Sequence, residues 1–110
     1  MEHEKGEERR LDLRRTNLSK ANLKNACLGR VDLPKSRLEG ANLEGARLEG
    51  ASLWRAHLER ANLRGAHLEG ANLTGATWLT REQIESAHTD EKTKLPAYLT
   101  PEDKNQETSP

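Results

Sequence analysis

A leucine returns at every fifth position from Leu13 to Leu73 without a miss. The residue two positions before each leucine is small or apolar, most often alanine. Self-similarity at a fixed period indicates a repeat architecture and has to be interpreted before local propensity. We therefore predict an array of five-residue units whose two apolar columns form the core. The predicted core leucines are Leu13, Leu18, Leu23, Leu28, Leu33, Leu38, Leu43, Leu48, Leu53, Leu58, Leu63, Leu68 and Leu73.

The period of five argues against a single amphipathic helix. Apolar residues on one face of a helix recur about every 3.6 residues, so a step of five carries the leucines around the whole cylinder. In an extended backbone, residues two apart point the same way. Only 33% of the chain is hydrophobic, but nearly all of it falls in the two columns, so low hydrophobicity does not imply disorder. Each unit is predicted to be one short extended side followed by a bend.

The second residue after each leucine marks the bend. Glycine and asparagine, which tolerate turn conformations at the least cost, occupy this position in seven units. The other units hold a basic residue at this position, among them Lys20, Arg30, Lys35, Arg55 and Arg60. We expect these units to use a turn that ordinary L-residues adopt.

The units at 41–45, 61–65 and 71–75, with sequences ANLEG, ANLRG and ANLTG, resemble the pentapeptide-repeat family. The resemblance covers residues 11 to about 80. It implies an all-β solenoid, a right-handed quadrilateral β-helix in which four units close one square coil of twenty residues, giving about 3.5 coils here. The next central position after Leu73 holds Trp78, which we expect to lie in the core and to close the array.

Four segments follow from this organisation. Residues 1–10 form a charged N-terminal arm, 11–79 the β-helix, 80–102 a C-terminal cap, and 103–110 a polar tail predicted to be disordered. No comparable cap precedes the array, so the first coil is left either open for pairing with a second copy or protected by charge alone.

The cap is predicted to contain a short α-helix over 81–88 that covers the last coil. Thr80 and Gln83 have the spacing of a capping box, and Leu79 and Ile84 hold the positions of a hydrophobic staple around it.

Charge and composition limit the classes of partner. Residues 1–37 carry ten Lys/Arg and six Asp/Glu, whereas 81–110 carry four and seven. This gradient is too weak for a dedicated nucleic-acid binder, and no apolar run approaches the roughly 20 residues of a membrane span. Cys27 has no second cysteine with which to form an intrachain disulfide. We expect a cytoplasmic protein with neither a nucleic-acid nor a membrane partner.

No arrangement of reactive residues predicts catalysis or metal binding. His57 and His67 lie on opposite sides of the square, and Cys27 shares an outward column with His67 but lies two coils, about 9.6 Å, away. Zinc ligands lie at about 2.0–2.3 Å from the ion. Ser52 and His57 occupy adjacent sides of a rod with flat faces and a filled interior, which offers no pocket. We therefore predict no enzyme, cofactor, metal or small-molecule substrate.

One outer face is a candidate partner-binding patch. Arg15, Lys35 and Arg55 stack in one basic column, with Arg14 and Trp54 beside it. Tryptophan and arginine are enriched at binding hot spots, and stacked like charges cost stability unless something offsets them. The alternative is a solvated face on which Trp54 covers the Pro34 ring.

Two functions remain open at this point. The first is a non-catalytic scaffold or interaction module with a protein partner or a second copy of itself. The second is implied by the family resemblance, in which acidic dimeric members imitate duplex DNA and bind type II topoisomerases, so the alternative is a DNA-mimic inhibitor of gyrase. The acidic pairs Glu39/Glu59 and Glu49/Glu69 are interleaved with arginine, which weakens this second reading.

Overall fold

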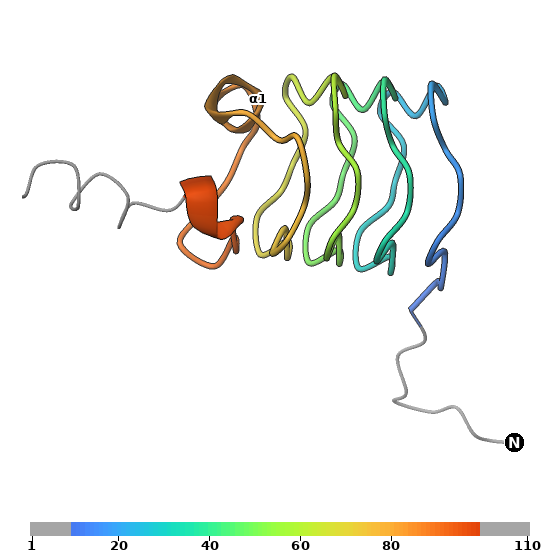
Figure 1. The fold of residues 1–110 in the computed structure, drawn as a ribbon, viewed down its shortest axis with the longest axis horizontal. Coiled ribbons are helices and arrows are strands. Elements are labelled where there is room, and N and C mark those ends of the chain that lie inside the picture. The colour runs from blue at the N-terminus through green and yellow to red at the C-terminus, as the bar shows by residue number, and fades with distance from the viewer. Residues whose placement is uncertain (1–9, 100–110) are drawn as a thin grey trace, which may run out of the picture.

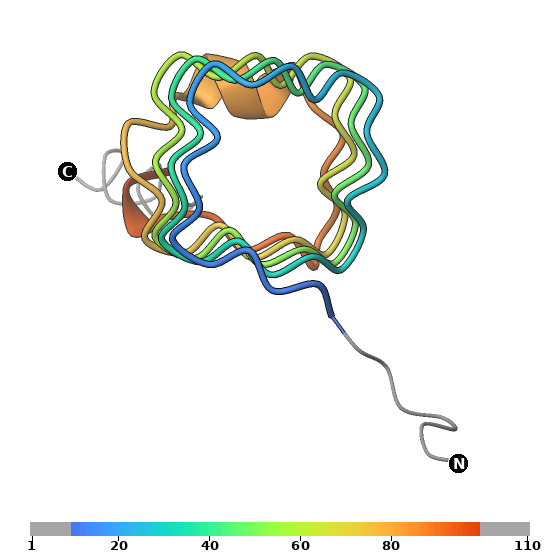
Figure 2. The same cartoon turned by 90° about the vertical axis from the view of Figure 1, so that its right-hand side faces the viewer.

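The computed structural model describes residues 10–99, which wind into a stack of square coils (Figures 1 and 2). Parallel β-bridges join residues twenty positions apart, as in Asp12 to Asp32, Asp32 to Ser52 and Ser52 to Asn72. Each bridge is isolated, and a turn follows it within the same unit. Each side of the square, which we call a wall, therefore contributes one bridged residue per coil and forms no long strand. The prediction of one short extended side and one bend per unit is confirmed.

Backbone hydrogen bonds tie each unit to the coils on both sides. The amide of Leu43 donates to the carbonyl of Asn62 at 2.8 Å, and the amide of Asn42 donates to the carbonyl of Ala21 at 2.9 Å. The corner is closed within the unit, because the amide of Ala46 donates to the carbonyl of Leu43 at 3.0 Å. The same three bonds recur along the array, so nearly every buried backbone group has a partner.

The asparagine that precedes many of the leucines supports the corner. Its side-chain oxygen accepts from the amide two residues later, as in Asn42 to Glu44 at 3.1 Å and Asn72 to Thr74 at 3.0 Å. Such local side-chain bonds favour turns over continued strand. The outward asparagine of the ANL pattern is therefore a turn-forming residue.

The leucines point inward and fill the coil. All nine from Leu33 to Leu73 are at most 1% exposed, which confirms their predicted place in the core. Leu13, Leu18, Leu23 and Leu28 are only partly buried and pack against this core, because the first coil has a neighbour on one side alone.

The prediction that Trp78 lies in the core is wrong. Its side chain is 70% exposed, whereas Leu79 is 2% exposed and joins the core cluster. Trp78 has a φ of 59°, a left-handed conformation that in the regular units occurs two residues after the central leucine. The corner thus comes early in this unit, so the indole turns outward and the next residue takes the inward position.

The expected distinction between glycine corners and basic corners is also wrong. Lys20, Arg30, Lys35, Arg55 and Arg60 have φ values of 59° to 62°, close to the 67° to 75° of the corner glycines. The left-handed conformation costs an L-residue about 1–2 kcal/mol. It is adopted here because a different turn would break the hydrogen bonds to the coils above and below.

The helix α1 spans Arg81–Glu85 and begins where the capping box predicts. The Thr80 hydroxyl accepts from the Gln83 amide at 3.1 Å, and the Gln83 side-chain oxygen accepts from the Thr80 amide at 2.7 Å. The helix ends three residues earlier than the expected 88. The reason is that the chain returns to the coil register: the Ser86 carbonyl accepts from Gly65, and the His88 amide donates to Ala66.

Beyond α1 the chain continues the winding in irregular form. Figure 2 shows α1 within one wall of the square. The side-chain nitrogen Nε2 of Gln83 donates to the carbonyls of Leu58 and Ala61, both at 2.9 Å. Bridges join His88 to His67 and Lys94 to Asn72. The 3₁₀ helix η1, Ala97–Leu99, then brings Leu99 against the core.

The N-terminal arm before Arg10 and the tail 103–110 lie outside the described residues, as do 100–102 of the predicted cap. Within residues 10–99 no helix has the length and apolarity needed to cross a membrane.

Replacing Leu43 by alanine is expected to lower the free energy of unfolding by about 2–5 kcal/mol, because a fully buried side chain leaves a cavity. Leu23→Ala, in the same column of the half-buried first coil, should cost less. Urea denaturation followed by circular dichroism measures both. Equal losses in the two variants would contradict the burial gradient.

Gly65→Ala isolates the conformational requirement of the corner. Gly65 has a φ of +67°, and an added Cβ would meet nothing closer than the backbone of Gly45 at 3.9 Å. We expect a loss of about 1 kcal/mol from the left-handed conformation alone. Gly29→Ala is the matched control, since Gly29 has no positive φ and its Cβ would make ordinary contacts. Urea titration of both proteins should show a loss for Gly65→Ala only.

Candidate functional site

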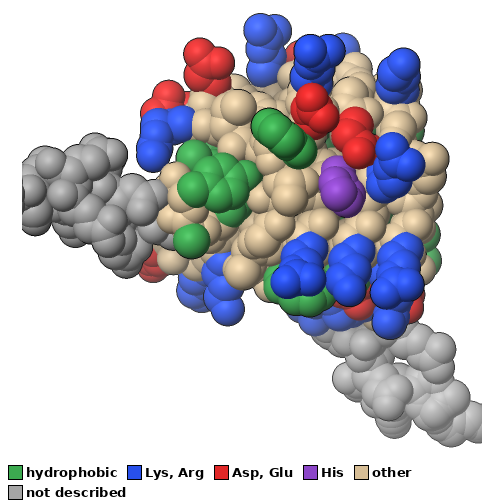
Figure 3. All heavy atoms as spheres, in the orientation of Figure 1, with side chains coloured by type: hydrophobic (Ala, Val, Ile, Leu, Met, Phe, Trp, Pro, Cys, Tyr) green, Lys and Arg blue, Asp and Glu red, His purple; other side chains and the backbone are tan. Residues whose placement is uncertain are grey.

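The structure brings the predicted patch together on one wall. Arg15, Lys35 and Arg55 occupy the same corner of three successive coils with φ values of 59° to 60°. Arg14 lies beside the first of them and Trp54 beside the last. Figure 3 shows basic side chains in a row across the coils on this face. We call these five residues the basic wall.

Trp54 holds two of the cations. The Arg55 guanidinium carbon lies 4.9 Å from the indole centroid and the Lys35 ammonium nitrogen lies 5.5 Å from it. A cation over an exposed aromatic ring gains about 0.5–1 kcal/mol. The indole is 37% exposed, so part of it stays available to a partner. Trp54 therefore offsets some of the repulsion between Lys35 and Arg55 and orients both.

Arg14 differs from the other cations because a carboxylate binds it. Its Nη2 lies 2.9 Å from Asp12 Oδ2, and its Nε lies 3.0 Å from Asp12 Oδ1. The pKa of Asp12 lies below its ordinary value, chiefly because of these side-chain hydrogen bonds. Among the described residues no carboxylate forms an ion pair with Arg15, Lys35 or Arg55. The uncompensated charge of the basic wall rests on these three.

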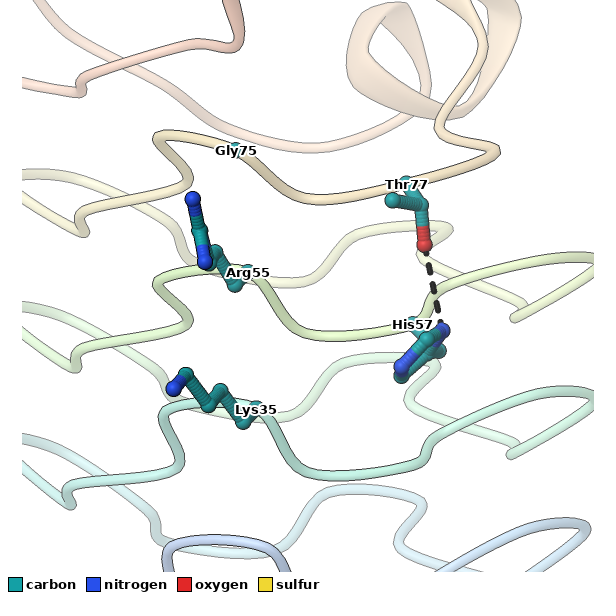
Figure 4. Close-up of a pocket in the computed structure, with 5 residues that line it drawn as sticks. All are labelled: Lys35, Arg55, His57, Gly75 and Thr77. Carbon is teal, nitrogen blue, oxygen red and sulfur yellow. Dashed lines mark hydrogen bonds between the residues drawn. The ribbon is translucent and has the colours of Figure 1, made fainter.

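Two shallow depressions flank Lys35. One, of about 360 Å³, is lined by Arg14, Arg15, Asp32, Pro34, Lys35 and Trp54. The other, of about 540 Å³, is lined by Lys35, Arg55, His57, Gly75 and Thr77 (Figure 4). Pro34 and Trp54 line the same depression. Both depressions are open to solvent.

The second depression contains a pair that the sequence analysis missed. His57 Nδ1 lies 3.2 Å from the Thr77 hydroxyl oxygen one coil away, as Figure 4 shows. The twenty-residue register of positions 57 and 77 is the signal that would have found it. The pair adds hydrogen-bonding groups beside Lys35 and Arg55, which suits a carboxylate group of a ligand or partner.

A second missed cluster lies on another wall. Ligand atoms of Glu49, His67 and Glu69 all lie within 4.8 Å of one another. The sequence signal for it is that Glu69 follows His67 by two residues and Glu49 by twenty, which places a histidine and two carboxylates in adjoining columns. The expectation of no metal site overlooked this combination.

The exposed Trp78 forms an apolar patch with its neighbours. Trp78 and Tyr98 are 70% and 51% exposed and border one depression with Leu79. The Tyr98 hydroxyl donates to the carbonyl of Ala76 at 2.8 Å and accepts from the amide of Leu79 at 3.1 Å. Tyr98 thereby ties the C-terminal segment to the unit that contains the early corner.

The repeat pattern matches a known family. The profile for pentapeptide repeats finds eight copies, in residues 9–34 and 41–77, which is more than half of the chain. The chain belongs to the pentapeptide-repeat family. No curated protein matches the sequence.

Solved pentapeptide-repeat structures resemble the fold. QnrB1, a plasmid-mediated fluoroquinolone resistance protein, aligns with a TM-score of 0.64 at 28% identity, over 74% of this chain and 38% of QnrB1. A pentapeptide repeat protein from the thylakoid lumen of Arabidopsis thaliana aligns with a TM-score of 0.53 at 28% identity, over 76% of this chain and 60% of that protein. The chain spans less than two thirds of either relative. The likeness implies a right-handed quadrilateral β-helix.

Proposed function

We propose that the protein is a non-catalytic scaffold that binds an acidic protein partner through the basic wall. The observation that carries this proposal is the indole of Trp54 held against Lys35 and Arg55, in a column of cations without carboxylate partners in the described residues. The scaffold is a rod of about three and a half coils over 11–79, followed by a cap over 80–102.

The energetics of the basic wall favour an acidic partner. Like charges at the spacing of neighbouring strands repel, and the contact with Trp54 offsets only part of that repulsion. Carboxylates of a partner would form charge-assisted hydrogen bonds with the guanidinium groups. The partly exposed indole would supply apolar contact area at the centre, as tryptophan does at binding hot spots.

Two features support binding over catalysis. The interior is filled by leucine and alanine side chains, so a ligand meets only the outer walls. The depressions on the basic wall are shallow and open, whereas catalytic sites exclude water and converge several groups on one reacting atom. We propose that this binding takes place in the cytoplasm. The partner at the basic wall is then another protein or a second copy of the chain.

Exchange of two residues tests the basic wall. Trp54→Ala/Arg55→Glu removes the aromatic anchor and inverts one charge, so the dissociation constant of a partner isolated by pull-down should rise at least tenfold. Arg64→Glu makes the same charge change on a different wall and is the control. Binding would be measured by calorimetry at low and high salt, since exposed charges are screened by salt. Equal affinity of the wild type and the double variant would contradict the proposal.

A specific observation keeps a second function open, namely the likeness to QnrB1, a fluoroquinolone resistance protein. In this reading the chain inhibits a type II topoisomerase as a DNA mimic. A mimic of duplex DNA has to present dense negative charge, whereas the basic wall presents the opposite sign.

We therefore expect purified protein to leave gyrase supercoiling unchanged, even in large molar excess over the enzyme. A gel assay of supercoiled plasmid measures this directly. If the protein inhibits gyrase and the Trp54→Ala/Arg55→Glu variant inhibits it equally, the DNA-mimic function would replace the basic-wall proposal.

A further inference from the structure

The wall that carries Glu49, His67 and Glu69 gathers one imidazole and two carboxylates. The two glutamates occupy the same position on successive coils, and His67 lies two residues before Glu69. All three side chains are between one third and two fifths exposed. Their ligand atoms lie within 4.8 Å of one another.

Glu69 has an unsatisfied oxygen in this cluster. Its Oε1 is buried and has no hydrogen-bond partner among the described residues. A buried polar atom without a partner costs free energy and calls for an explanation such as an ion. Two carboxylates stacked on neighbouring coils also repel each other. A divalent cation between the two carboxylates, bound by both oxygens of Glu69, would remove both penalties.

The second oxygen of Glu69 faces the imidazole. His67 Nδ1 lies 3.7 Å from Glu69 Oε2, which is too long for a hydrogen bond. Two ligands of a tetrahedral zinc ion, each about 2.1 Å from the metal, lie about 3.4 Å apart. A small side-chain movement would therefore bring both atoms to one ion.

Neighbouring residues hold the cluster in place. The His88 ring stacks on the His67 ring with centroids 4.8 Å apart and an interplanar angle of 19°. The Arg47 guanidinium lies 3.4 Å from Glu49 Oε2. Such contacts around the ligands orient them for a metal. From this geometry we propose that Glu49, His67 and Glu69 bind one divalent transition-metal ion of the zinc type, with water completing the coordination.

The chain contains its own control for this proposal. The sequence AHLE of residues 66–69 recurs at 56–59, on the opposite wall. There the His57 Nδ1 is engaged by the Thr77 hydroxyl at 3.2 Å. The glutamate one coil below, Glu39, is paired with Arg37 at 3.5 Å as Glu49 is with Arg47, but its other oxygen also accepts from the hydroxyl of Ser19 at 3.1 Å. The same four residues thus make a candidate metal site on one wall only.

Calorimetric titration of the chelator-treated full-length chain with zinc sulfate tests the site. We expect one zinc ion per chain and a rise in melting temperature on binding, because the ion binds the folded state. His67→Ala/Glu69→Gln should weaken binding at least tenfold and abolish the rise. His57→Ala/Glu59→Gln, the equivalent change on the opposite wall, should alter neither.

Two further measurements make the result decisive. His3, outside the described residues, is changed to alanine in a third variant, which should bind zinc as the wild type does. The visible absorption of bound Co²⁺ should show imidazole and carboxylate coordination that disappears in His67→Ala/Glu69→Gln. The proposal is overturned by the absence of zinc binding, by binding that survives this double change, or by binding that His3→Ala removes.

Discussion

The structure depends on the hydrogen-bond register between coils twenty residues apart. Each unit donates hydrogen bonds to both neighbouring coils and accepts hydrogen bonds from both, so no unit can change its corner without losing bonds on two sides. This explains why Arg60 adopts the same left-handed corner as Gly65. The conformational penalty of about 1–2 kcal/mol is set against several buried backbone bonds, each of which costs about 1–3 kcal/mol if one partner is left unpaired. Neighbour contacts override local preference, as is typical of solenoids.

Much of the fold could be predicted because burial and period coincide in the sequence. The leucine at every fifth position identified the interior, and the capping box at Thr80 and Gln83 identified the start of α1. The exceptions are places where the period ends. Trp78 lies five residues after Leu73, where the repeat predicts an inward residue, but the corner comes early and Leu79 takes the inward position instead. The length of α1 is set by the return to the coil at His88, and pairing of this kind is not encoded in helix propensity.

Less of the candidate site than of the fold could be predicted from the sequence. The twenty-residue coil, which the family resemblance implies, placed Arg15, Lys35 and Arg55 in one column, because residues twenty apart then stack. The contacts of Lys35 and Arg55 with the Trp54 ring depend on side-chain rotamers, which the register does not specify. The cluster of Glu49, His67 and Glu69 was missed for a related reason. Its members belong to two adjoining columns, and only the packed structure shows how closely side chains from neighbouring columns approach.

Because the interior is filled, the chemistry of this protein depends on outward side chains that lie next to each other on successive coils. An outward residue has few possible partners within its own unit, but it contacts the residues twenty positions before and after it on the neighbouring coils. A single substitution at one of those positions therefore changes its environment. The repeated AHLE sequence shows the effect. Thr77 engages His57 on one wall, whereas His88 stacks on His67 on the other. Units that share the sequence AHLE therefore acquire different chemistry without any change in the core, because the leucines inside are the same for both. A solenoid with a uniform interior can in this way present a basic surface on one wall and a cluster of metal ligands on the next.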